Sequence, residues 1–384
     1  QRNSEYWHAG LFYNGCRPAS KSDLPQTIPD NHTKESRRTK KCSLNLGKHR
    51  SWRAFDLGYA PMIIKAVAPG KAVLIGEYSV LAGGPAVVLA TSSFASISLE
   101  STGSESWAFE TLGFQSEPEL VNPDKLPASS GSSLISAILE KFGLARLRDL
   151  SKEGLPPSRI ITDSSSFFLA GKKLGLGSSA AVCTASYRLL CQVLSREPNL
   201  REAIDIHRTW QGGAGSGLDV AASWHGKIIS FQDSESQKFY LPPEIWIQFV
   251  WSGKSSTTVD HIHKFQLLKG KRNKKALESL KESSQTTKEQ FNLQNLLHYQ
   301  KTLKEFDEAC GLNIFSPEHS KLGTIAHQNG LAYKPCGAGG GDIGVAFGDD
   351  TNKENKQRFV DQATSAGFVC LNLETAEHGV KVTT

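Results

Sequence analysis

The segment Gly175–Val182 (GLGSSAAV) most strongly limits what this chain can fold into, because its glycines stand directly before the strongest predicted helix. Glycine lets the backbone approach a bound anion, and a helix start offers unpaired N–H groups and the positive end of the helix dipole. Such a loop is typical of a phosphate-binding site. Ser178 and Ser179 add hydroxyl groups that can bind phosphate or Mg²⁺, which prefers oxygen ligands. An alternative stays open, in which Ser178 only caps the helix.

Three further glycine-rich segments carry related signals. Ala68–Lys71 (APGK) places a lysine directly after a turn, where its ammonium group could be held over a bound phosphate. Cys336–Ile343 (CGAGGGDI) contains too many glycines for a structural role alone, so we expect something to approach its backbone closely. Gly212–Val220 (GGAGSGLDV) brings Asp219 to the end of a flexible run. Taken singly, Lys71 is most simply a surface lysine and Asp219 a turn or cap residue.

Two other nucleotide-binding patterns are not satisfied. Gly253–Ser255 (GKS) looks like the end of a Walker A loop, but Gln248 stands where that loop requires glycine. Gly175–Ala180 fits the glycine spacing of a dinucleotide-binding turn, but the acidic residue at the matching distance, Glu197, follows a helix instead of ending a parallel strand. A hydride-transfer enzyme is therefore disfavoured.

Between these motifs the sequence predicts both strands and helices. Ala95–Glu100 alternates apolar and polar residues, as a half-buried strand does, and two long helices are expected across Lys274–Ala309. Ser316 is expected to cap another helix that has Pro317 at its first position. Asp233–Lys238 is polar enough to be a linker. The chain is therefore expected to contain both strands and helices.

In this order and spacing, the motifs resemble those of the GHMP kinase superfamily, and the resemblance covers Met62–Thr384. Ala68–Leu81 is similar to the first motif of that superfamily, Gly175–Val182 to its phosphate-binding second motif, and Cys336–Val345 to its third. The resemblance implies an α+β fold with a ribosomal-S5-like N-terminal domain, a ferredoxin-like C-terminal domain and an active-site cleft between them. We expect the domains to span residues 62–238 and 239–384.

Three details resemble the phosphomevalonate kinases within this superfamily. They are Gly76–Val80 (GEYSV), with Tyr78 where mevalonate kinases typically carry His, together with Gly215–Ala222 and Gly337–Asp342. This resemblance implies ATP-dependent phosphorylation of (R)-5-phosphomevalonate to 5-diphosphomevalonate. The alternatives are a mevalonate kinase, another small-molecule kinase of the superfamily, and a catalytically silent relative that binds a metabolite. Retention of both Lys71 and Asp219 argues against silence.

The resemblance also implies a role for each motif residue. Lys71 would neutralise the charge of the transferring phosphoryl group, Asp219 would lie near the nucleophile, and Ser179 would help to place Mg²⁺. The residues expected to hold ATP are Gly175, Leu176, Gly177, Ser178, Ser179 and Ala180. The residues expected at the acceptor substrate are Lys71, Tyr78, Lys173, Arg208, Ser216, Gly337, Ala338, Gly339, Gly340 and Asp342.

Chemistry qualifies the expected role of Asp219. The second pKa of a phosphate monoester is about 6, so the acceptor oxygen is largely ionised at neutral pH and needs little deprotonation. We therefore expect Asp219 to orient Lys71 or the substrate, whereas an alcohol acceptor would need a true base. Some members of the superfamily use a carboxylate upstream of this aspartate as a second metal ligand. Here the nearby stretch is His207–Gln211 (HRTWQ), so Asp205 or Glu202 would have to serve.

The positive charge of the chain is concentrated at its beginning. Residues 1–61 hold eleven basic and five acidic residues, a net charge of +6, which equals that of the whole chain. The remaining part is neutral, so we expect no nucleic-acid partner. Met62 is the only methionine and stands directly before the first predicted strand. We therefore expect residues 1–61 to be a disordered or non-native leader, with a genuine basic appendage as the alternative.

Other features of the composition favour a cytoplasmic enzyme. Seven scattered cysteines without a C-x-x-C pair are expected to be reduced, and Cys183 and Cys191 are expected to share one helix face. His261 and His263 are two positions apart, which does not favour a metal pair on a helix. No apolar stretch of 18 residues occurs, so no membrane span is expected. The partner is expected to be a small phosphorylated substrate, and a homodimer stays open.

Overall fold

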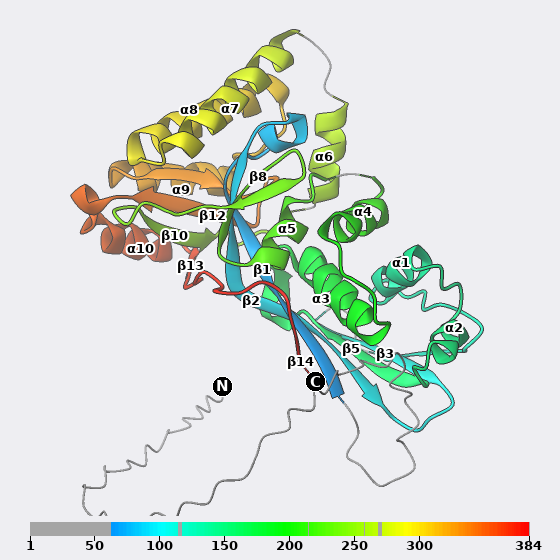
Figure 1. Ribbon diagram of the computed structural model, residues 1–384. Helices are drawn as coiled ribbons and strands as arrows, with labels where there is room; N and C mark the ends of the chain where they lie inside the picture. The colour runs from blue at the N-terminus through cyan, green and yellow to red at the C-terminus, as the bar shows by residue number, and fades with distance from the viewer. Residues whose placement is uncertain (1–62, 114–116, 214, 257, 268–270, 384) are drawn as a thin grey trace, which may run out of the picture. The chain divides into compact units, whose positions relative to one another are not determined.

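The structure is a computed structural model that describes residues 63–113, 117–213, 215–256, 258–267 and 271–383. All of these residues belong to one compact unit, Ser51–Thr384. The expected leader, residues 1–61, and the proposed start at Met62 lie outside the described residues. Within the described part, the chain forms both helices and strands, and its strand pairs are antiparallel with one exception, as suits an α+β protein (Figure 1).

The larger sheet has two long central strands, β1 (Ile63–Ile75) and β2 (Ala86–Ser101), which pair antiparallel. Its path runs β14-β1-β2-β5-β3-β4, while β8 pairs with β2 and β9 pairs with β8. The pairs are antiparallel except for β3 with β5. The other strands are β3 (Trp107–Leu112), β4 (Glu119–Val121), β5 (Ser158–Asp163), β8 (Ile228–Gln232), β9 (Glu235–Lys238) and β14 (Lys381–Thr383).

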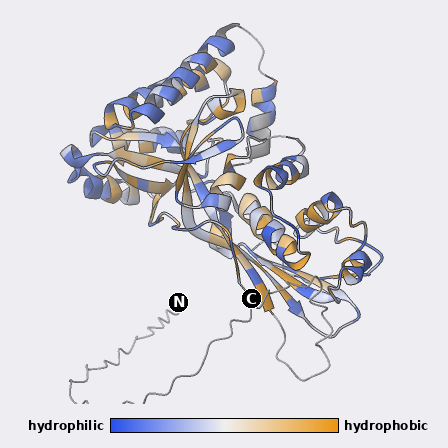
Figure 2. Cartoon of the chain, in the orientation of Figure 1, coloured by the Kyte–Doolittle hydropathy of each residue, from blue (hydrophilic) through white to orange (hydrophobic). Residues whose placement is uncertain are grey.

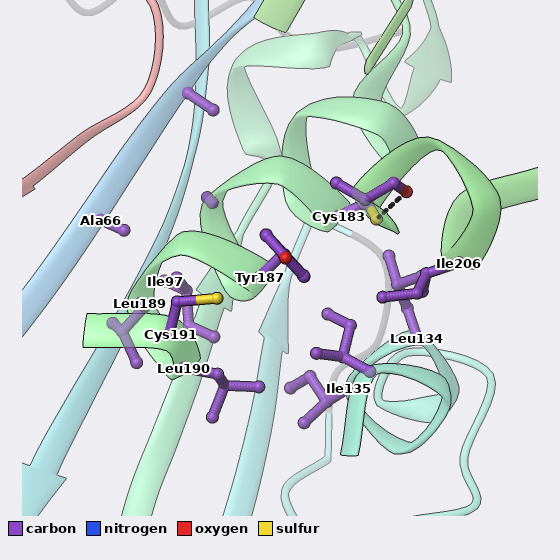
Figure 3. Packing of buried hydrophobic residues seen from close by; sticks show 14 of the residues in the cluster. Ala66, Ile97, Leu134, Ile135, Cys183, Tyr187, Leu189, Leu190, Cys191 and Ile206 are labelled. Atoms are coloured by element: carbon purple, nitrogen blue, oxygen red, sulfur yellow. Dashed lines mark hydrogen bonds between the residues drawn. The ribbon is translucent and has the colours of Figure 1, made fainter. Parts of the chain in front are cut away.

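Helices cover one face of this sheet. α3 (Ser178–Val193) and α5 (Leu218–His225) pack on β1 and β2. Outside them lie α1 (Ser133–Lys141), α2 (Leu147–Lys152) and α4 (Leu200–Trp210). Figure 3 shows how Cys183 and Cys191 of α3 join the buried apolar cluster, with Cys183 bonded to the Ala203 carbonyl of α4. Both are free thiols on the buried face, as predicted.

The smaller sheet has the order β11-β12-β10-β13, with all pairs antiparallel. Successive residues of β10 point to opposite faces of this sheet. Phe249 packs in the cluster with residues of α8, and Val250 packs in the cluster with residues of α9 and α10. Polar residues dominate the outer side of α7 and α8 in Figure 2. The elements are β10 (Trp246–Trp251), β11 (Ala332–Pro335), β12 (Ile343–Gly348), β13 (Val369–Leu371), α6 (Thr258–Gln266), α7 (Lys271–Glu289), α8 (Leu293–Cys310), α9 (Pro317–Gln328) and α10 (Asn355–Ser365).

Most of the helices and strands predicted from local patterns are present, and one predicted linker is a strand. The two long helices across 274–309 are confirmed as α7 and α8, and Ser316 caps α9 by accepting a hydrogen bond from the N–H of His319. The polar stretch Asp233–Lys238 was predicted to be a linker, which is wrong, because Glu235–Lys238 forms β9. Its polar side chains suit a sheet edge, where one side of a strand faces water. The division of the chain at residue 238 stays a prediction.

Candidate functional site

A cavity of about 550 Å³ lies where β1, the starts of α3 and α5, and the glycine loop between β11 and β12 come together. Within the described residues, it gathers most of the side chains predicted from sequence. The predicted residues that line it are Lys71, Tyr78, Lys173, Gly175, Gly177, Ser179, Ser216, Asp219, Gly337, Ala338 and Asp342. The predicted residues outside its lining are Leu176, Ser178, Ala180, Arg208, Gly339 and Gly340.

Lys71 crosses the phosphate loop at a point where only glycine leaves room. Its backbone N–H donates to the Leu176 carbonyl at 2.8 Å, which fixes the loop against β1. A Cβ atom on Gly177 would lie 3.0 Å from both Cγ and Cε of Lys71. Gly337 comes close to the other end of the side chain, since its Cβ would lie 3.7 Å from the Lys71 Nζ. Gly177 therefore makes space for the lysine, whereas a side chain on Gly337 would make only an ordinary contact with it.

The start of α3 is open toward the cavity. Gly177 is the N-cap residue, its backbone is left-handed (φ 78°), and no side chain caps the first turn. The alternative that Ser178 caps the helix is therefore wrong, and Ser178 is instead buried in the first turn. Ser179 lines the cavity. An uncapped first turn has free N–H donors beside the positive helix end, which suits an anion.

Asp219 reaches the cavity from the first turn of α5. Gly217 caps that helix with a left-handed backbone, and a Cβ there would lie 2.5 Å from Ile204, so the turn requires glycine. The Asp219 carboxylate accepts the N–H of Val220 at 3.0 Å. Burial lowers the pKa of His207, and the negative charge of Asp219 partly opposes this shift. Lys71, Ser179 and Asp219 thus border one space.

Three charged groups of the cavity influence one another. Burial lowers the pKa of Lys173, Asp342 opposes this change, and Lys71 adds to it. Burial raises the pKa of Asp342, while the Ser256 N–H and the two lysines oppose the shift. The Ser256 N–H donates to Asp342 Oδ1 at 3.0 Å. Desolvation disfavours the charged forms of Lys173 and Asp342, and a bound anion would favour the charged form of the lysine.

Gly175 and Asp342 fit against each other across the cavity wall. Gly175 has a left-handed backbone (φ 84°), and a Cβ atom there would lie 2.3 Å from Cβ and 2.5 Å from Oδ2 of Asp342. Asp342 is itself left-handed, with φ 61°. Its N–H donates to the Lys254 carbonyl at 2.6 Å, and its carbonyl accepts from Ser252. Asp342 therefore joins the phosphate loop to the loop that follows β10.

Tyr78 ties the turn after β1 to the glycine loop. Its hydroxyl donates to the Ala338 carbonyl at 2.6 Å. Burial raises the pKa of Tyr78, and the nearby carboxylates of Asp307 and Glu77 raise it further, so the phenol keeps its proton and donates. Its backbone is left-handed (φ 59°), which is strained for a bulky residue. Tyr78 thus lines the cavity, as a residue predicted to contact the acceptor should, but its hydroxyl hydrogen is used to hold the glycine loop.

The glycine loop is held mainly by the protein itself. Gly340 donates its N–H to the Ile314 carbonyl at 2.9 Å, and a Cβ on Gly339 would lie 2.6 Å from Ile314. His319, fully buried in α9, bonds the Gly341 carbonyl through Nε2 at 2.8 Å and Tyr333 through Nδ1 at 2.8 Å. Burial lowers the pKa of His319 to about 4, so the ring is neutral. Sequence reasoning missed His319, which shows no local signal.

A buried ion pair below the cavity also escaped the sequence analysis. Lys334 donates to Glu77, to the Val73 carbonyl at 3.1 Å and to the Pro335 carbonyl at 2.9 Å. The other Glu77 oxygen accepts the hydroxyl proton of Tyr299 at 2.8 Å. Buried charges persist when they are paired and fully hydrogen-bonded, and this network meets that condition. Glu77 within the apolar run 72–81 was the one available signal.

Arg208, predicted to contact the acceptor, braces the loop before α5. Its Nε donates to the Gly215 carbonyl and its Nη2 to the Ser216 carbonyl, both at 3.1 Å. Its remaining nitrogen pairs with Asp205 at 3.3 Å. Glu202 accepts the hydroxyl proton of Tyr187. Neither carboxylate lines the cavity, so the predicted second metal ligand is not provided by them in this arrangement.

Lys172, next to Lys173 in the chain, has its ammonium group 5.9 Å from the centre of the Trp251 ring and does not line the cavity. Among the described residues, no group of three or more His, Cys, Asp or Glu side chains is arranged to hold a metal ion. A search of the same residues finds no helix with the length and apolarity that crossing a bilayer requires.

Comparison with known proteins places the chain in a family. Residues 170–227 match the N-terminal domain of GHMP kinases. A phosphomevalonate kinase of Saccharolobus solfataricus is 30% identical over 325 residues, which cover 76% of this chain and 92% of the relative. A phosphomevalonate kinase of Streptomyces sp. (strain CL190) is 26% identical over 368 residues, covering 82% and 97%.

The fold is shared with solved kinase structures. The Streptococcus pneumoniae phosphomevalonate kinase, in complex with phosphomevalonate and AMPPNP, superposes with a TM-score of 0.67 at 18% identity, covering 82% of this chain and 99% of that one. The α+β fold expected from the resemblance is therefore confirmed. The sequence match over nine-tenths of the Saccharolobus solfataricus relative, the family model and the shared fold agree that this chain belongs to the GHMP kinase superfamily, close to its phosphomevalonate kinases.

Proposed function

We propose that this chain transfers the terminal phosphoryl group of ATP to (R)-5-phosphomevalonate, giving 5-diphosphomevalonate and ADP. The observation that carries the proposal is the meeting of Lys71, Ser179 and Asp219 around one cavity at an uncapped helix start. The two curated relatives named phosphomevalonate kinase support the choice of acceptor. A second lysine, Lys173, also lines the cavity, which suits an acceptor that already carries a phosphate.

The residues present fit a nucleotide and its metal ion. The first turn of α3 offers uncapped N–H donors to phosphate oxygens, and Lys71 offers an ammonium group beside them. The Ser179 hydroxyl and the Asp219 carboxylate line the same cavity, and a small set of oxygen donors completed by phosphate oxygens is typical of Mg²⁺ sites. The ion would neutralise negative charge on the phosphates.

In the proposed mechanism the protein mainly positions the reactants and stabilises charge. Lys71 holds positive charge where negative charge develops on the transferring group, and it does so in a poorly hydrated space that strengthens the interaction. Lys173 neutralises the phosphate of the acceptor. Asp219 orients Lys71 and the acceptor, because the acceptor oxygen is already ionised at neutral pH, with a second pKa of about 6. The predicted cytoplasmic location and homodimer remain predictions.

ATP-dependent release of ADP, measured with phosphomevalonate, mevalonate, galactose and homoserine side by side, tests this proposal. We expect turnover with phosphomevalonate and little with the other three acceptors. A Lys71→Ala protein serves as the control for contaminating ATPases. Turnover of mevalonate but not phosphomevalonate would change the acceptor, and Asp219 would then be the base that an alcohol needs. No turnover with any acceptor would favour a silent metabolite-binding protein.

A further inference from the structure

We propose that His207 is a positioning residue that accepts a hydrogen bond from the Ser179 hydroxyl, turns the oxygen lone pairs toward the cavity, and so couples Mg²⁺ binding to nucleotide binding. The inference rests on the proposed function, in which Ser179 helps to hold the ion. It concerns a residue of the chain that neither the sequence motifs nor the proposed mechanism uses.

The geometry places the imidazole against the start of the phosphate helix. His207 lies in the last turn of α4 and is 2% exposed. Its Nε2 is 3.2 Å from the Ser179 Oγ, within hydrogen-bond distance. The ring lies nearly parallel to that of Trp210, with centroids 6.0 Å apart and an angle of 23°, which limits its rotation. The imidazole is thus buried and within hydrogen-bond distance of Ser179.

The chemistry of a serine hydroxyl gives this contact a direction. The group has one proton and two lone pairs, and a neutral imidazole has one nitrogen that accepts. A buried ring is favoured in its neutral form, because burial penalises the charged one. When Nε2 accepts a hydrogen bond from the Ser179 hydroxyl, both lone pairs of the oxygen are left for a cation in the cavity. Thr184 of the same helix instead donates to the Ala180 carbonyl at 2.7 Å, away from the cavity.

The surrounding charges make a neutral partner useful. Asp205 pairs with Arg208 and Glu202 bonds Tyr187, so of these three titratable side chains it is His207 that bonds to Ser179. A carboxylate in place of the imidazole would add a negative charge beside ATP and the phosphorylated acceptor, which already carry several negative charges. An uncharged acceptor orients Ser179 without that repulsion, which matters most when both ATP and a phosphorylated acceptor are bound.

The test measures nucleotide binding, not turnover. Titration calorimetry gives the affinity of ATP with and without Mg²⁺, and the ratio of the two affinities reports the coupling. We expect His207→Leu to lower this ratio by roughly 10-fold, as loss of a residue that orients a metal ligand commonly does. His207→Gln, which can place an accepting oxygen near Nε2, should retain much of the coupling. Thr184→Val is the matched control, since it removes a buried hydrogen bond of α3 outside the cavity.

A double-mutant cycle with Ser179→Ala separates positioning from packing. If His207 acts through Ser179, adding His207→Leu to Ser179→Ala should lower the ratio no further. An equal loss of ATP affinity with and without Mg²⁺, or losses that add in the double variant, would overturn the inference. If His207→Leu does not fold, His207→Asn takes its place, because its shorter amide cannot reach Ser179. Wild-type protein that shows the coupling but no turnover of phosphomevalonate would refute the proposed acceptor alone.

Discussion

The Lys334 ammonium group lies 2.5 Å from the Glu77 carboxylate, although the two residues are 257 positions apart in the chain. Their side chains are 2% and 0% exposed. The pair joins β11 of the smaller sheet to the turn that follows β1 of the larger one, directly below the cavity. The floor of the site is therefore also a structural connection between the two sheets.

Breaking this pair from one side should destabilise the protein strongly. Lys334→Met leaves the Glu77 charge buried without its partner, and such a loss typically costs about 3–5 kcal/mol. The free energy of unfolding from urea titration measures the effect. The double variant Lys334→Met with Glu77→Leu should recover part of the loss, because no unpaired charge remains. Strictly additive losses would show that the two groups do not depend on each other.

Lys71 and Asp219 should differ in how their loss depends on pH. Lys71→Ala removes charge stabilisation and should lower kcat by roughly 10²- to 10³-fold. Asp219→Asn should also lower kcat, and we expect its fractional loss to stay constant from pH 6.5 to 8.5, because the acceptor is already ionised. Steady-state kinetics with phosphomevalonate measures both. A loss confined to Asp219→Asn that follows a protonation step would show that Asp219 is a base.

Gly175→Ala should destabilise the protein by more than the cost of placing an alanine in a left-handed backbone conformation. The new Cβ atom would lie 2.3 Å from the Asp342 Cβ, so one of the two loops must move. Gly143→Ala is the control, since Gly143 is also left-handed (φ 79°) but has nothing within 4 Å of the added atom. The control should lose about 1–2 kcal/mol of stability, the cost of a left-handed alanine. Gly175→Ala should lose more and bind ATP weakly, whereas equal effects would exclude a role for Asp342.

Acidification should destabilise the fold through His319. Burial lowers the pKa of this side chain to about 4 from an ordinary 6.5, so the unfolded chain binds the proton more tightly than the folded one. The folded protein keeps its full free energy of unfolding above pH 6.5, where His319 is neutral in both states. As the pH falls from 6.5 toward 4, proton binding to the unfolded chain lowers that free energy by about 3 kcal/mol.

Urea unfolding at pH 7 and pH 4.5 measures this loss. His319→Gln keeps a donor for the Gly341 carbonyl but cannot take up the proton, so its stability should fall less between the two pH values. Burial also lowers the pKa of His207 and His225, which is why the variant and the wild type must be compared at both pH values. Identical falls in both proteins would rule out His319 as the group concerned.

The sequence predicted those parts of the site that short segments encode. Glycines before a helix, two serines and a lysine after a turn are local signals, and the structure brings Lys71, Ser179 and Asp219 to one cavity. The roles of these residues remain predictions. Ala95–Glu100 likewise shows the predicted alternation of buried and less buried residues, because a strand with one face in the core imposes a period of two.

Contacts between distant segments could not be predicted in this way. Glu77 bonds to Lys334 and to Tyr299, and both lie more than 200 positions further along the chain. Nothing in a local pattern indicates which lysine a buried glutamate will contact. Arg208 shows the opposite problem. A basic residue near a phosphate loop suggests ligand binding, but the carbonyls of Gly215 and Ser216 satisfy its guanidinium group.

The close fit of Gly175 against Asp342 has a consequence for how this site can change. A larger residue at position 175 needs the volume that the Asp342 side chain fills, and a shorter residue at 342 would leave the phosphate loop unsupported. The two positions are therefore expected to vary together among relatives. Anyone redesigning the acceptor pocket would have to substitute them as a pair.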